Sequence, residues 1–217
     1  MKRIFIVRHG QTKWNLEKRL QGVHGDSPIL TDETAMRNYQ HLGDYLAQYS
    51  YATVYSSPLP RSLTTAKKVL HSMNQAQRPI HLITDLRELS FGEWEGQSRA
   101  TLLAAHTELF RKLSQRVDDP ALATLGMENF QQAGQRFAMV IRQLTDKMAP
   151  DTNILVFSHG GVIQLGIEQL TENQHLSGLK NLSTSIVTPK DDHFELEVYN
   201  QTGCLPMVNL DEGNVSI

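Results

Sequence analysis

Cysteine, long hydrophobic runs and an excess of one charge are all scarce in this chain of 217 residues. Cys204 is the only cysteine, which excludes an intramolecular disulfide and a zinc site built on cysteines. The 21 basic and 23 acidic residues give a formal net charge of -2. We therefore expect no broad basic surface for nucleic acid or for an anionic membrane.

The apolar segments are short. The first one spans residues 4–7 and stops at Arg8, which is too short for the core of a signal peptide, and no later run is long enough for a transmembrane helix. A cytoplasmic protein is expected. No linker-like composition and no repeat divides the chain, and 40% hydrophobic residues can supply one sizeable core. The sequence thus predicts one domain over residues 1–217.

Short β-branched segments alternate with longer segments of helical periodicity, which predicts an α/β fold with a largely parallel sheet. The segment "DLRELSFGEWEGQS" has no clear period and is predicted to be a loop. The predicted strands are residues 3–8, 52–57, 80–84, 153–161, 185–189 and 193–200. The predicted helices are residues 31–46, 58–73, 99–113, 129–148 and 162–170.

Polar residues cluster where four of these predicted strands end, which is where such sheets bind ligands. The segments are "VRHG" (7–10), "SSPLPR" (56–61), "DLRE" (85–88) and "FSHGG" (157–161). Arg8 and His9 can converge on one ligand only if the strand stops there, which Gly10 permits. At the second site, Gly160 and Gly161 would let backbone N–H groups at a helix start approach an anion beside His159.

This residue set fits a phosphate group better than any other anion. Arg8 and Arg61 offer donor forks that match phosphate oxygens, and a neutral imidazole can attack phosphorus. Glu88 is the best-placed carboxylate to protonate a leaving oxygen. Taken singly, each residue is more commonly structural or solvated, and Asn15 could simply cap a helix. Only their coincidence at four strand ends favours catalysis.

The ordered set "RHGQTKWN", "RLQG", "SSPLPRSLTTA", "LRELSFGEWEG" and "VFSHGGVI" resembles the histidine phosphatase (phosphoglycerate mutase-like) superfamily, from residue 4 to about 198. The resemblance implies a three-layer sandwich with helices on both faces of the sheet. It also implies that His9 becomes phosphohistidine while Arg8, Arg61 and His159 hold the phosphoryl group.

The resemblance adds further roles around the same pocket. Asn15, Gln21 and Gly22 match positions that line the phosphate pocket, and Glu88 matches the proton donor. Neither a metal ion nor another cofactor is expected, because the cationic cluster supplies the charge. The substrate is expected to be a small phosphorylated metabolite.

Phosphatase activity is favoured over phosphoglycerate mutase activity because "LSFGEWEGQS" looks like the phosphatase branch. A non-catalytic phospholigand-binding module is the remaining alternative; such a module has no use for both His9 and Glu88, and both are present. An exposed edge formed by the C-terminal strands would permit a homodimer.

A helical cap over the pocket is predicted at about residues 98–135, and specificity would reside there. Its polar side chains could read the substrate or be the solvated faces of two amphipathic helices. The sequence departs from the family pattern at Thr34 and in "GMEN" (126–129), which bears on the shape of the entrance. The cap residues in question are Arg99, His106, Arg111, Lys112 and Glu128.

Overall fold

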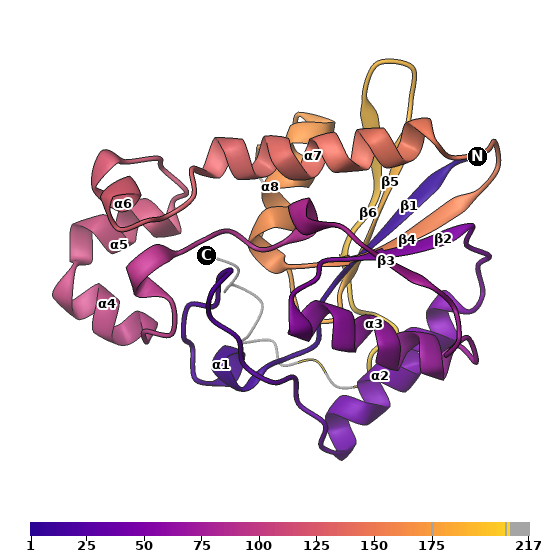
Figure 1. Ribbon diagram of the computed structural model, residues 1–217, viewed down its shortest axis with the longest axis horizontal. Helices are drawn as coiled ribbons and strands as arrows, with labels where there is room; N and C mark the ends of the chain where they lie inside the picture. The colour runs from indigo at the N-terminus through magenta and orange to yellow at the C-terminus, as the bar shows by residue number, and fades with distance from the viewer. Residues whose placement is uncertain (175, 207, 209–217) are drawn as a thin grey trace.

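A six-stranded sheet forms the centre of the molecule in the computed structural model, which describes residues 1–174, 176–206 and 208 (Figure 1). The strands lie in the order β3-β2-β4-β1-β5-β6. β1 to β4 pair in parallel, and β5 runs antiparallel to both β1 and β6. The strands are β1 (Arg3–Arg8), β2 (Thr53–Ser56), β3 (Ile80–Leu82), β4 (Asn153–Ser158), β5 (Thr184–Pro189) and β6 (Phe194–Gln201).

The predicted α/β fold with a mostly parallel sheet is confirmed, and helices cover both faces of that sheet (Figure 1). The α-helices are α1 (Lys13–Leu16), α2 (Glu33–Leu46), α3 (Pro60–Ser72), α4 (Arg99–Ala105), α5 (Thr107–Ser114), α6 (Pro120–Thr124), α7 (Phe130–Asp146) and α8 (Gly160–Thr171). Two 3-10 helices, η1 (Thr84–Leu86) and η2 (Gly92–Trp94), lie between β3 and α4.

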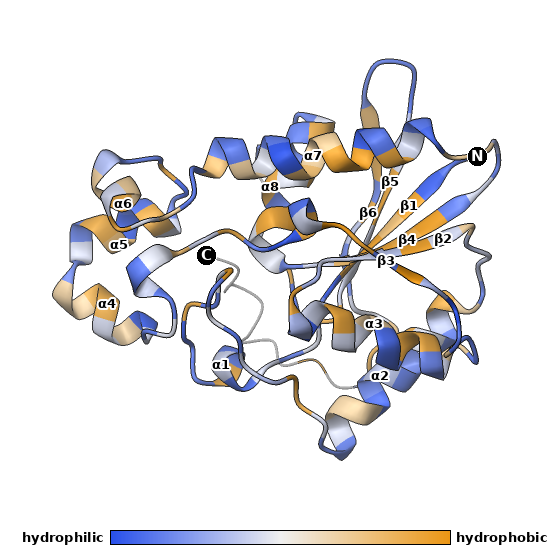
Figure 2. Cartoon of the chain, in the orientation of Figure 1, coloured by the Kyte–Doolittle hydropathy of each residue, from blue (hydrophilic) through white to orange (hydrophobic). Residues whose placement is uncertain are grey.

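The side chains of β1 point alternately to the two faces of the sheet, and each face is covered by a layer of helices. Ile4 and Ile6 belong to an apolar cluster with α7 and α8, whereas Phe5 and Val7 belong to a second cluster with α2 and α3. All four side chains are fully buried, because successive strand residues face opposite sides of a sheet that is covered on both. The apolar colour of the strands in Figure 2 follows this burial.

The predicted helix over 99–113 is wrong in one respect, because it is broken into α4 and α5. The break falls at His106, whose backbone leaves the helical region (φ -138, ψ 46). Its imidazole stacks on the buried indole of Trp94, with 5.5 Å between ring centroids and 26° between planes. α1 and α6, at four and five residues, are too short to produce a periodic signal and were not predicted.

Helices α4, α5 and α6 extend from one end of the sandwich (left in Figure 1), within the segment predicted as a cap.

None of the described helices is both long and apolar enough to cross a membrane. The predicted single domain runs to residue 217, but residues 175, 207 and 209–217 lie outside the described part of the chain. β3 and β6 form the edges of the sheet, and a homodimer through β6 stays a prediction.

Candidate active site

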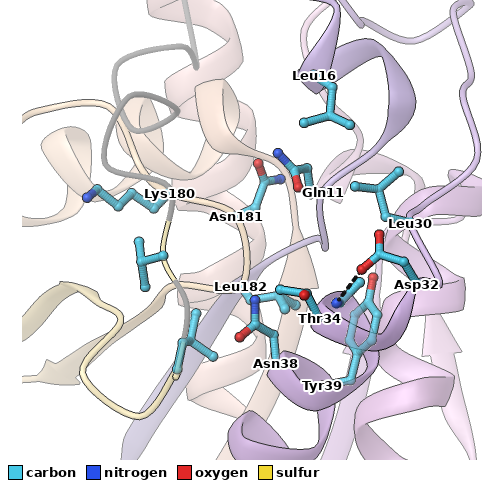
Figure 3. Close-up of a pocket in the computed structure, with 13 residues that line it drawn as sticks. Gln11, Leu16, Leu30, Asp32, Thr34, Asn38, Tyr39, Lys180, Asn181 and Leu182 are labelled. Carbon is cyan, nitrogen blue, oxygen red and sulfur yellow. Dashed lines mark hydrogen bonds between the residues drawn. The ribbon is translucent and has the colours of Figure 1, made fainter.

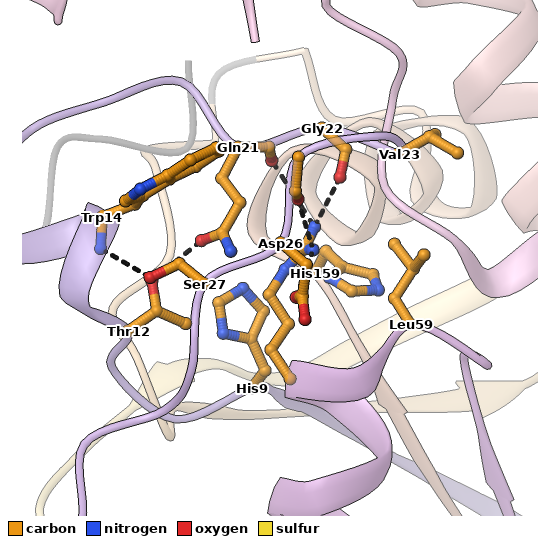
Figure 4. A network of polar contacts seen from close by, with 12 residues as sticks. His9, Thr12, Trp14, Gln21, Gly22, Val23, Asp26, Ser27, Leu59 and His159 are labelled. Atoms are coloured by element: carbon orange, nitrogen blue, oxygen red, sulfur yellow. Dashed lines mark hydrogen bonds and ion pairs between the residues drawn. The ribbon is translucent and has the colours of Figure 1, made fainter. Parts of the chain in front are cut away.

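Two neighbouring strands bring the two predicted histidines together. β1 and β4 run in parallel with Arg8 opposite Ser158, so the next residue of each strand, His9 or His159, emerges at the same edge. Their ring centroids are 5.2 Å apart, and Figure 4 shows the two imidazoles. Both side chains are buried, at 3% and 0% exposure.

The end of β2 supplies the next part of the site. Because Ser56 lies opposite Phe157 in β4, the following residue, Ser57, reaches His159. Its Oγ lies 2.8 Å from Nε2 of that imidazole. α3 then begins at Pro60, whose fixed φ suits a first turn, and this start places Arg61 at the same edge, 2% exposed.

The tautomer of His9 follows from its hydrogen bond. Its Nδ1 lies 2.7 Å from the carbonyl oxygen of Gly10, and a carbonyl can only accept, so Nδ1 carries the proton. Nε2 therefore holds the lone pair. Burial lowers the pKa of His9 well below its usual value, and the positive charges of Arg61 and Arg8 lower it further. The imidazole is thus neutral at pH 7.

The backbone around His9 is fixed by two residues that sequence reasoning missed. The side-chain amide of Asn181 donates to the carbonyl oxygen of His9 at 3.0 Å, and Gly10 N–H donates to Thr65 Oγ1 at 2.9 Å. Thr65 lies one helical turn after Arg61, so its position on the same face of α3 could have been predicted. No signal in the sequence marked Asn181.

Backbone carbonyls hold both arginines. The guanidinium of Arg61 donates to the carbonyl oxygens of Gly22 at 2.9 Å and of Gly25 at 3.4 Å, and it lies 3.7 Å from the carboxylate of Asp26. Arg8 Nη1 donates to the carbonyl oxygen of Leu179. The predicted cationic residues are therefore present together and held in place.

Glu88 lies on the loop after η1 and is 4% exposed. Three backbone N–H groups donate to it, from Leu89 (3.1 Å), Gly161 (3.1 Å) and Val162 (2.8 Å). Burial raises the pKa of Glu88 above its usual value, against the opposing effects of Arg61 and these three donors. Glu88 can thus hold a proton at a pH where exposed carboxyls have lost theirs.

The start of α8 contacts Glu88 through the backbone of Gly161. The N–H group of Gly161 is taken up by the protein's own carboxylate on Glu88, so it is not left for an outside anion. A Cβ on Gly161 would lie 2.8 Å from Leu89 Cδ1 and 3.0 Å from Glu88 Oε1, so glycine gives these two side chains room. Contact of Gly160 with the ligand stays a prediction.

Several buried polar atoms beside His9 have no hydrogen-bond partner among the described residues: Arg61 Nε, Gln21 Nε2 and His159 Nδ1. Gln21 uses only its oxygen, which accepts from Thr12 Oγ1 at 2.8 Å. Arg61 Nε and Gln21 Nε2 are donors, and buried donors are rarely left unsatisfied in proteins, so these two atoms point to a ligand rich in acceptor oxygens. Figure 4 shows Gln21 on the loop that runs over His9 and His159.

Asn15 takes the capping role that sequence analysis left open. Its Oδ1 accepts from the backbone N–H of Thr12 at 3.0 Å, in a capping box that begins α1, and Asn181 donates to the same oxygen at 3.3 Å. Contact of Asn15 with the ligand stays a prediction. The described residues contain no group of three or more His, Cys, Asp or Glu side chains that could hold a metal ion.

A separate cavity of about 480 Å³ lies beside the loop after His9, and none of the nine predicted site residues lines it (Figure 3). Thr34, where the sequence departs from the family pattern, lines this cavity instead of the histidine site. Its lining is Gln11, Leu16, Leu30, Asp32, Thr34, Ala35, Asn38, Tyr39, Lys180, Asn181, Leu182, Leu205 and Val208.

Four of the five polar cap residues contact other side chains of the protein. The pairs are Arg111 with Glu108, Lys112 with Asp119, Glu128 with Arg136, and His106 on Trp94. Arg99 differs, because its Nε is buried without a hydrogen-bond partner among the described residues. Burial and the charge of Arg8 lower the pKa of Arg99 to about 10.

Comparisons with known proteins agree with this geometry. The family model of the histidine phosphatase superfamily (branch 1) matches residues 4–202. The adenosylcobalamin/alpha-ribazole phosphatase of Escherichia coli is 32% identical over 168 residues, which is 77% of this chain and 78% of that protein.

Solved structures give the same result. A phosphoglycerate mutase from Bacillus anthracis superposes with a TM-score of 0.79 at 25% identity and covers 94% of each chain. The alpha-ribazole phosphatase from Shigella flexneri superposes with a TM-score of 0.74 at 27% identity, over 92% of this chain and 96% of that one. This chain therefore belongs to branch 1 of the histidine phosphatase superfamily, and it is a phosphatase.

Proposed function

We propose that this phosphatase hydrolyses a small phosphomonoester without a metal ion, through a phosphohistidine formed on His9. The observation that carries the proposal is the lone pair on His9 Nε2 beside buried donors that have no partner among the described residues. A phosphoryl group offers the acceptor oxygens that such donors need.

The reaction has two steps. In the first, His9 Nε2 forms a bond to phosphorus while the bond to the leaving oxygen breaks, and Glu88 gives that oxygen its proton. In the second, the carboxylate of Glu88 takes a proton from water, the water oxygen attacks phosphorus, and the P–N bond breaks. Inorganic phosphate is released and both residues return to their starting states.

Fixed positive charge replaces the metal ion in this scheme. Arg8, Arg61 and His159 surround the phosphoryl oxygens and stabilise the charge of the transition state. Gln21 Nε2 adds a neutral donor, and Asn15, Gly22 and Gly160 complete the lining of the pocket. Chelation with EDTA should leave the rate unchanged, and a strong loss of rate would reopen the question of a metal.

The substrate carries, in this proposal, a second anionic group. Arg99 lies at the start of the cap, close enough to Arg8 for the two charges to repel, and Nε of Arg99 has no partner among the described residues. An anionic substituent near the phosphoryl group would relieve that repulsion. Relatives named for a ribazole phosphate and for fructose-2,6-bisphosphate support a small phosphorylated metabolite as the class.

Hydrolysis in ¹⁸O-labelled water, followed by ³¹P NMR, tests the proposed reaction. The wild type should release phosphate from p-nitrophenyl phosphate with one ¹⁸O atom, and His9→Ala should be inactive. Conversion of 3-phosphoglycerate to 2-phosphoglycerate without release of phosphate would favour the mutase alternative. Binding of phosphate by the wild type without any turnover would favour the non-catalytic module.

A further inference from the structure

Glu95, in the segment "GEWEG", has no part in the chemistry proposed above, yet its carboxylate is saturated with backbone donors. Oε1 accepts from the N–H groups of Val23 at 3.1 Å and of Phe91 at 3.0 Å. Oε2 accepts from His24 at 2.7 Å and also from Gly25. One half-buried side chain thus joins the loop after η1 to residues 23–25.

The backbone that donates to Glu95 also accepts hydrogen bonds from Arg61, through its carbonyl groups. The guanidinium donates to the carbonyl oxygens of Gln21 at 3.5 Å, Gly22 at 2.9 Å and Gly25 at 3.4 Å. Residues 21–25 therefore present N–H groups to Glu95 and carbonyl groups to Arg61. Figure 4 shows the two contacts from the carbonyls of Gln21 and Gly22.

Both polar groups of the peptide between Gly22 and Val23 are hydrogen-bonded, the N–H to Glu95 and the carbonyl to Arg61. The carbonyl of Gly22 and the N–H of Val23 belong to the same planar trans peptide, so they point in opposite directions. A carboxylate that fixes the N–H of Val23 therefore aims the carbonyl of Gly22 at Arg61. Hydrogen bonding to a charged acceptor at one end also polarises the peptide and strengthens the bond at the other.

The backbone at this point has no room for a side chain. A Cβ on Gly22 would lie 2.2 Å from Glu95 Oε1 and 2.7 Å from the carbonyl oxygen of Leu89. Glycine is required here because the carboxylate comes so close, and a methyl group at this position would displace either the carboxylate or the loop. Gly22→Ala is thus an independent way to disturb the same contact.

We propose that Glu95 is a positioning residue for phosphoryl binding, which acts through the peptide of Gly22 to hold Arg61 with its guanidinium facing His9. The inference rests on the proposed role of Arg61 in holding the phosphoryl group. Glu95 itself touches no substrate.

A double-mutant cycle between Glu95 and Arg61 tests the inference. The readout is the dissociation constant of orthovanadate, measured by equilibrium titration so that no turnover is needed. Glu95→Gln keeps the shape of the side chain, but one of its two oxygens becomes a donor amide. It should weaken vanadate binding about tenfold in the wild type and less than about threefold in an Arg61→Lys background.

Gly22→Ala should follow the same cycle, and it serves as the test if Glu95→Gln does not fold. Glu93→Gln is the matched control, because Glu93 is exposed on the same loop, and it should leave vanadate binding unchanged. Equal losses in the wild-type and Arg61→Lys backgrounds would overturn the inference. Failure of the proposed reaction would appear separately, as turnover that survives His9→Ala.

Discussion

At the scale of single residues, burial sets the two ionisable groups of the proposed reaction in the states that they need. Burial disfavours charge, so it lowers the pKa of His9 and raises the pKa of Glu88. A neutral imidazole can attack phosphorus, and a protonated carboxyl group can give its proton to the leaving oxygen. The same physical cause therefore prepares a nucleophile and an acid.

Replacement of Glu88 by glutamine should separate substrates by their leaving groups. Glu88→Gln cannot donate a proton of comparable acidity, so kcat should fall about 100-fold or more for an alkyl phosphate. p-Nitrophenolate is stable without a proton, so kcat for p-nitrophenyl phosphate should fall far less. Steady-state kinetics on both substrates measure the difference, and equal losses would show that Glu88 is not the acid.

Replacement of Arg99 tests the anionic end of the substrate. Arg99→Gln should lower kcat/KM for 3-phosphoglycerate about tenfold, because a charge-assisted hydrogen bond to its carboxylate is lost. Glycerol 3-phosphate, which has a neutral hydroxyl group in that place, should change by less than about twofold. Arg111→Gln, on an exposed residue that pairs with Glu108, is the matched control. Equal losses on the two substrates would contradict this reading of Arg99.

Sequence reasoning found the residues that stand at strand ends and missed those that hold them. Arg8, His9 and His159 are conspicuous because a buried strand has no use for them. Ser57 and Asn181 are ordinary polar residues, and only the pairing of strands far apart in the chain brings them to the histidines. Such partners depend on tertiary contacts that a single sequence does not encode locally.

At the scale of elements, Arg136 of α7 fastens the segment that leads to Glu88. Its guanidinium donates to the carbonyl oxygens of Asp85 at 2.6 Å and Arg87 at 3.1 Å. It also forms two hydrogen bonds of 2.9 Å with the carboxylate of Glu128, in the segment "GMEN". The departure from the family pattern therefore contains a structural ion pair.

Arg136→Met should loosen this segment and destabilise the protein by about 2 kcal/mol. The pair is mostly buried, with side chains 12% and 18% exposed, and the substitution leaves Glu128 and two carbonyls without their donor. Urea unfolding measures the loss. Arg142→Met is a control on the same helix, where the guanidinium makes a single long bond of 3.4 Å on the surface. A loss no larger than that of the control would contradict the structural role.

The elements themselves were largely predictable, and their ends were not. All six strands were predicted; in β1 and β4, burial on both faces gives continuous apolar runs such as residues 4–7, whereas the edge strands β3 and β6 are partly exposed. The break between α4 and α5 was missed because the apolar period continues through His106, and the stacking on Trp94 is a contact between distant segments. α1 depends on a capping box formed by Thr12 and Asn15, which is too local to show in periodicity.

At the scale of the whole molecule, two buried neutral histidines make folding sensitive to acid. Burial lowers the pKa of both His9 and His159 below the ordinary value, so the unfolded chain takes up protons below about pH 6.5 that the folded chain does not. Stability must therefore fall as the pH drops below that value. Glu88, whose pKa is raised, acts in the opposite sense.

His9→Gln should reduce this sensitivity. Between pH 7.5 and pH 5.5 the wild type should lose about 1 kcal/mol more unfolding free energy than His9→Gln, because one pKa unit corresponds to about 1.4 kcal/mol. Glu88 is present in both proteins. Urea midpoints at the two pH values measure the difference, and His41→Gln, on an exposed histidine, should behave as the wild type. A parallel loss in wild type and His9→Gln would contradict the buried neutral state.

The proposed mechanism predicts a covalent bond between phosphorus and His9, and rapid-quench trapping with a ³²P-labelled phosphomonoester tests it most directly. Wild-type protein should carry label within the first turnover, stable in base and lost in acid, as expected of a phosphoramidate. His9→Ala should carry none. A first turnover that releases phosphate with no protein-bound label at any quench time, or label that persists in His9→Ala, would contradict the mechanism.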